Sequence, residues 1–145
     1  MNDSVAIADA VVARLASGTF TPSFVPVRGY VPQFNLAELR GLHVTVVPRA
    51  LPEERTLDRS SVTHVHEVDV AVQQRVAVER TAEIDVLMDL VQTIHDWMRG
   101  ETLELADGRR VAYVGATREP LYSAAHLREF RCFTAVLTLS YEVTR

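Results

Sequence analysis

The sequence has few of the residues that cross-link small domains or bind structural metal ions in them. Cys132 is its only cysteine, which excludes a disulfide framework and a zinc site built from cysteines. Its six glycines are dispersed, so no glycine-rich phosphate loop is present. No apolar run reaches the roughly 18 residues that a membrane span needs. These absences predict a fold that depends on its own hydrophobic core.

Positive charge is carried by arginine alone. There is no lysine, and 15 arginines against 19 acidic residues give a formal net charge of −4. A dedicated nucleic-acid-binding domain is usually basic, so this balance argues against one. The absence of lysine fits either a GC-rich coding bias or a preference for planar charged groups at interfaces. Asn2 and Asp3 stand where a signal peptide would be basic, which predicts assembly in the cytoplasm.

The chain of 145 residues suits a single domain, 1–145, with a core of its own. Apolar residues at i, i+3, i+4 and i+7 predict an N-terminal helix, capped by Asp3 or Ser4 and ended by Gly18. The same periodicity predicts a longer helix over residues 81–99, with Thr81 as its N-cap. The apolar face of that helix comprises Ile84, Leu87, Met88, Val91, Ile94, His95 and Met98.

Several stretches are typical of β-strands. They cover residues 24–31, 42–47, 62–78, 103–105, 109–114 and 133–143. The first is predicted to be an edge strand because Pro26 lies within it and Pro22 and Pro32 stand close to its two ends. Residues 62–78 and 133–143 alternate between apolar and polar, as half-buried antiparallel strands do. The valines expected on the core face of the first are Val68, Val70, Val72, Val76 and Val78. Asp107-Gly108 is a hairpin signal between two short strands.

The predicted fold class is α+β. A mostly antiparallel sheet of about four to five strands is covered on one face by two main helices. A β-hairpin, a short helix over residues 123–130 capped by Ser123, and a long polar loop over about 49–61 complete it. That loop cannot bury itself, and we expect it to be solvated, mobile and functional.

The side chains that usually carry chemistry have simpler interpretations. His64 and His66 share a strand face, but a metal site needs further ligands at a recognisable spacing. His95 is expected to be a core histidine on its helix. Cys132 is expected to fill a packed sheet rather than act as a nucleophile. No pattern predicts a catalytic residue, a bound cofactor or a metal site, so an enzyme is not the favoured interpretation.

The order of these segments resembles that of the small tail-terminator, or tail-completion, proteins of long-tailed phages and prophages. The similarity covers most of the chain. It is carried by the N-terminal helix ending at Leu15 and by residues 27–32 (VRGYVP), 36–39 (LAEL), 42–48 (LHVTVVP), 69–75 (DVAVQQR), 83–90, 119–122 (EPLY), 126–127 and 130–139.

This resemblance implies a homo-oligomeric ring, commonly a hexamer, at the head-proximal end of the tail tube. Such a ring stops tube polymerisation and joins the tail to the head connector, without a cofactor and without turnover. DNA passes through its lumen without sequence readout. We expect the polar loop to contact the tube or connector, and the hairpin tip to contribute second. The candidate interface residues are Arg49, Glu53, Glu54, Arg55, Asp58, Arg59, Arg109 and Arg110.

Other interpretations stay open at this point. The protein could instead be a head-completion or stopper protein at the connector, or an adaptor of a contractile injection system. A different class is a small α+β enzyme or ligand-binding domain with a pocket near His95, Cys132 and Tyr122. A closed ring would favour the first group, and a monomer with a formed pocket would favour the second.

Overall fold

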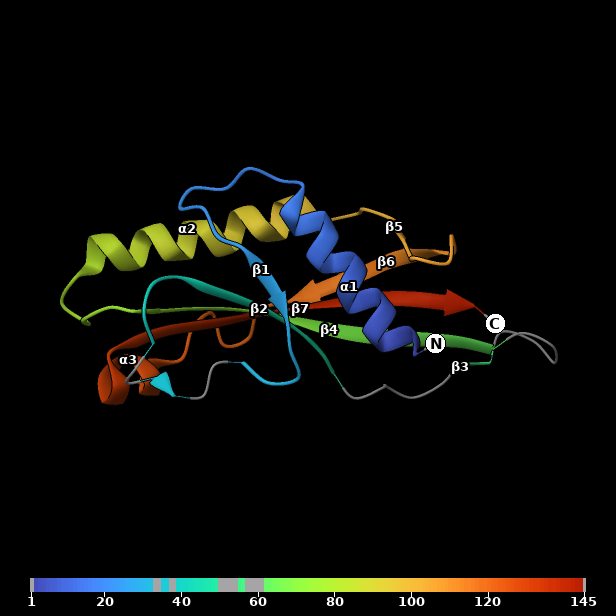
Figure 1. The fold of residues 1–145 in the computed structure, drawn as a ribbon. Coiled ribbons are helices and arrows are strands. Elements are labelled where there is room, and N and C mark those ends of the chain that lie inside the picture. Colours follow the sequence, from blue (N-terminus) through green and yellow to red (C-terminus); the bar gives the residue numbers. More distant parts are fainter. Residues whose placement is uncertain (1, 33–34, 37–38, 50–54, 57–61, 145) are drawn as a thin grey trace.

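A curled sheet carries two helices on one face (Figure 1). The computed structural model describes residues 2–32, 35–36, 39–49, 55–56 and 62–144. The helices are α1 (Asp3–Ala16) and α2 (Thr81–Met98), with a short α3 (Ala124–Phe130) at one end. None of the described helices is long and apolar enough to cross a membrane. The predicted α+β class is confirmed.

Within the described residues, the sheet has seven strands in the order β1-β2-β4-β7-β6-β5, with β3 paired to β4 outside that path. The strands are β1 (Pro26–Arg28), β2 (His43–Pro48), β3 (Arg55–Thr56), β4 (Val62–Arg75), β5 (Leu103–Glu104), β6 (Arg110–Thr117) and β7 (Cys132–Thr144). All pairs are antiparallel except β1 with β2. Three of the strands are only two or three residues long, and one of these, β3, lies in the stretch predicted to be a polar loop.

The centre of the sheet is the long antiparallel pair of β4 and β7, in register from Thr63 and Thr144 to Arg75 and Cys132. Every second side chain of β7, from Phe133 to Val143, is buried under α1 and α2, as the alternation predicts. The prediction fails at Val78, which is 49% exposed because the chain leaves the sheet after Arg75.

Helix α1 begins one or two residues earlier than the predicted caps, Asp3 or Ser4, would place it. The side chain of Asn2 accepts the Val5 N–H and is the N-cap, so Asp3 and Ser4 lie in the first turn. Gly18 stands at the C′ position, as predicted, but its backbone is not left-handed. It is needed for space instead, because a Cβ there would come within 2.8 Å of the Phe20 ring and 3.0 Å of Trp97.

Helix α2 has Arg80 as its N-cap instead of the predicted Thr81, without a side-chain cap hydrogen bond. The Arg80 guanidinium pairs with Glu83 at 3.1 Å. Ser123 caps α3 as predicted and accepts the His126 N–H. Cys132 is buried with Leu36 and Leu39 in a small second cluster, which confirms its interpretation as a packing residue.

Candidate assembly surfaces

The predicted polar loop falls largely outside the described residues, which include neither Glu53 and Glu54 nor Asp58 and Arg59. Arg55 lies in β3, paired with Thr63 of β4. The contact of this loop with the tail tube or the connector stays a prediction.

At the start of that segment, Arg49 is tied to the sheet. Its guanidinium contacts Glu67 at 2.9 Å and Asp69 at 3.2 Å, both on β4. Burial raises the pKa of Asp69, although the Thr138 hydroxyl at 2.6 Å and the charge of Arg49 oppose that shift. Arg49 thus compensates acidic side chains of its own sheet.

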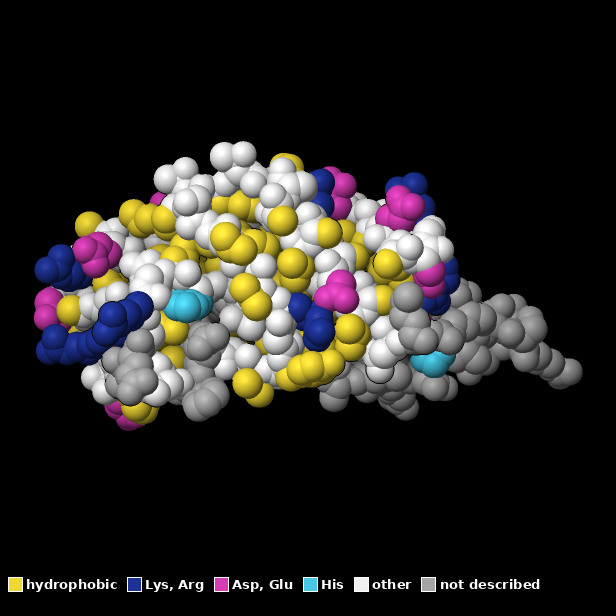
Figure 2. Space-filling view, viewed as in Figure 1, with side chains coloured by type: hydrophobic (Ala, Val, Ile, Leu, Met, Phe, Trp, Pro, Cys, Tyr) yellow, Lys and Arg dark blue, Asp and Glu magenta, His cyan; other side chains and the backbone are white. Residues whose placement is uncertain are grey.

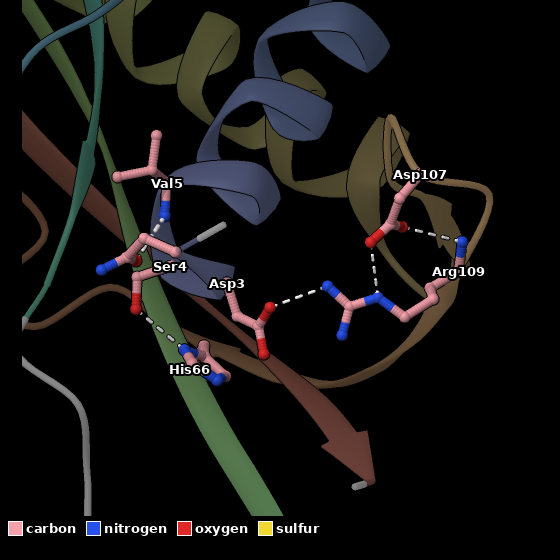
Figure 3. A network of polar contacts seen from close by, with 7 residues as sticks. Asp3, Ser4, Val5, His66, Asp107 and Arg109 are labelled. Atoms are coloured by element: carbon pink, nitrogen blue, oxygen red, sulfur yellow. Dashed lines mark hydrogen bonds and ion pairs between the residues drawn. The ribbon is translucent and has the colours of Figure 1, made fainter.

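The second candidate, the hairpin tip between β5 and β6, is fixed to the start of α1 (Figure 3). Arg109 Nη2 donates to the buried Asp3 at 2.8 Å, and Arg109 Nε donates to Asp107 at 2.8 Å. The backbone N–H of Arg109 and then its side chain hold the pKa of Asp107 below its ordinary value. Hydrogen bonds to Asp3 and Asp107 raise the pKa of Arg109. Arg109 is therefore an internal tie, whereas its neighbour Arg110 is exposed.

A further contact in the same region joins α1 to β4. Ser4 Oγ lies 2.8 Å from His66 Nδ1, and His66 is buried (Figure 3). The rings of His64 and His66 are 6.3 Å apart. Among the residues that the structure describes, no group of three or more His, Cys, Asp and Glu side chains is arranged to hold a metal.

Neither of the two pockets described below is lined by His95, Cys132 or Tyr122, the residues of the enzyme interpretation. His95 lies half-buried on α2, where burial first and then the charges of Arg99 and Arg118 lower its pKa. Cys132 lies in the separate cluster with Leu36 and Leu39, and burial raises its thiol pKa. A thiol held protonated in this way is a poor nucleophile.

An apolar surface, the β1 patch, lies along the sheet edge and is made of Val25, Val27, Tyr30 and Val31. These side chains are 80%, 58%, 67% and 61% exposed. Arg28 lies among them, bonded to Asp9 of α1 at 2.7 Å and placed 5.2 Å from the centre of the Tyr30 ring. In Figure 2, hydrophobic side chains gather over the middle of the face where Figure 1 places β1 and α1. The edge strand predicted over residues 24–31 was the sequence signal for this surface.

A groove lies between α1 and the β5–β6 hairpin, and we call it the α1–β5 groove. Its volume is about 500 Å³. Short side chains of α1 leave it open, with Leu105 and Ala106 of the hairpin opposite. The lining residues are Asn2, Val5, Ala6, Asp9, Ala10, Ala13, Glu104, Leu105 and Ala106.

A basic cleft of about 330 Å³ lies where β4 ends and α2 begins. Arg75, Arg80 and Arg131 line it, together with Glu83, which pairs with Arg80. Arginine side chains gather at that end of the molecule in Figure 2. Arg131 is the C-cap of α3 and adopts a left-handed backbone with φ 50°.

Comparison with solved structures gives a full-length match. A chain of a structure described as "Virion of native gene transfer agent (GTA) particle" aligns with a TM-score of 0.59, covering 98% of this chain and 97% of that one. The two chains share a fold. Their identity is 20%, so the likeness concerns the fold alone. No family model and no curated protein matches the sequence.

Proposed function

We propose that this protein is a structural component of a phage-like virion. The observation that carries the proposal is the shared fold over nearly the whole of both chains, because the neighbour belongs to a gene transfer agent particle. The similarity of segment order to phage tail-completion proteins supports the same class. No turnover and no cofactor are part of this role.

Within the virion, we propose the position of tail terminator. Copies of the chain would form a ring at the head-proximal end of the tail tube, stop its growth and meet the head connector. An exposed apolar edge such as the β1 patch suits a protein that works in an assembly. The net charge of −4 suits a lumen through which DNA passes without being held.

The experiment is polymerisation of the tail-tube protein of the same particle with and without this chain. Tubes should become shorter and carry extra density at one end when the chain is present, as seen by electron microscopy. A matched addition of the head-connector protein controls for nonspecific shortening. Unchanged tube lengths together with binding to the connector would contradict the terminator role and place the protein at the connector instead.

A further inference from the structure

The β1 patch exposes four large apolar side chains between residues 25 and 31, each more than half exposed. Single exposed apolar residues are ordinary, whereas an apolar cluster of this kind marks a contact surface. The patch therefore requires an occupant that covers side chains.

Strand addition is a poor way to cover this edge. The Gly29 N–H donates to the Val46 carbonyl at 2.9 Å, so alternate residues of β1 direct their backbone groups toward β2. Pro26 and Arg28 consequently present theirs to the outside, and Pro26 has no N–H to offer. The occupant should instead be a concave apolar surface that receives the side chains.

The α1–β5 groove of the same chain has the required character. Small apolar side chains line most of it, and its 500 Å³ lies within the size range of protein binding pockets. Its charged residues, Asp9 and Glu104, are both acidic, and the charged residue of the patch is Arg28. Asp9 already pairs with Arg28 of its own chain, but Glu104 has no ion-pair partner among the described residues.

Patch and groove lie on opposite flanks of α1, which packs against both β1 and β5 (Figure 1). A copy cannot place its own patch in its own groove. Each copy can give a patch to one neighbour and a groove to the other, which is the head-to-tail contact that generates rings. We propose that the β1 patch of one copy docks in the α1–β5 groove of the next. This contact rests on the proposed function, whose ring it would build.

Two variants test the contact, each with a matched control. Ala13→Trp fills the groove, whereas Ala16→Trp places the same side chain one turn later on α1, outside the lining residues. Tyr30→Asp puts a carboxylate in the patch, whereas Val114→Asp makes a like change at an exposed position of β6. Light scattering over a concentration series gives the oligomeric state. Circular dichroism checks the fold.

The wild type and both controls should form the same oligomer. Ala13→Trp and Tyr30→Asp should each weaken association by roughly thirtyfold or more, as loss of a hot-spot residue does. Mixed together, the two variants keep one intact patch and one intact groove between them. They should therefore form a 1:1 dimer that does not grow further.

Association of both variants at wild-type strength would overturn the contact and leave the terminator proposal standing. A wild-type chain that stays monomeric at every concentration would also overturn it. Failure of the chain to limit tube length, with the oligomer and its variants behaving as described, would instead overturn the terminator role alone.

Discussion

Tyr141 carries a buried hydroxyl that makes no hydrogen bond to any residue the structure describes. Burial, and then the neighbouring Tyr113, raise its pKa above the ordinary value. An unpaired buried hydroxyl costs stability, so Tyr141→Phe should raise the free energy of unfolding by about 1 kcal/mol. Urea denaturation measures it, with the half-buried Tyr113→Phe as the control. A loss of stability in Tyr141→Phe would show that the hydroxyl has a partner.

Arg131 ends α3 with a left-handed backbone, a conformation that favours glycine over other residues. Arg131→Gly should therefore stabilise the fold by up to about 1 kcal/mol. Arg128, three residues earlier and exposed within α3, gives the opposite expectation, since Arg128→Gly should cost about 1 kcal/mol. Thermal unfolding of the pair distinguishes backbone strain from loss of charge, because both variants remove one arginine. Equal losses in both would contradict the strain.

At the scale of elements, the tie between the hairpin and α1 depends on one of two adjacent arginines. Arg109→Gln should lower the melting temperature because it leaves the buried Asp3 without this cation, whereas Arg110→Gln should leave it nearly unchanged. Equal effects of the two variants would contradict this distinction.

The same tie should depend on pH. The lowered pKa of Asp107 means that its share of stability is present above the ordinary aspartate pKa and is lost as the pH falls through the folded value. The difference between wild type and Arg109→Gln should therefore shrink on strong acidification. A difference in melting temperature that stays constant from neutral to acidic pH would count against the contribution of Asp107.

Local patterns predict the elements well where the chain alternates regularly. Residues of β7 and the apolar stripe of α2 follow their periodicity because each buries one face against the same core. Details that depend on tertiary contacts are not predicted: a side chain at Gly18 would meet the ring of Trp97, about eighty positions away, as well as that of nearby Phe20. Likewise, the sequence suggests that Arg109 is a surface charge, whereas in the fold it donates a hydrogen bond to Asp3 of α1.

The candidate surfaces depend even more on the tertiary arrangement. The prolines around β1 predict an edge, but not that Val25 and Tyr30 stay uncovered beside it. The α1–β5 groove exists because the curled sheet brings β5 against α1, a contact between residues about a hundred positions apart in sequence. Periodicity within a segment does not predict which distant elements come into contact.

For the whole molecule, we propose a place at the head-proximal end of the tail. A peptide tag added to this chain, with antibody and gold, would locate it on particles and on free tails by electron microscopy. The account predicts label at the head–tail junction of particles and at one end of tails that lack heads. Label on tail-less heads, along the tube or at the distal tip, with none on the head-proximal end of free tails, would contradict it.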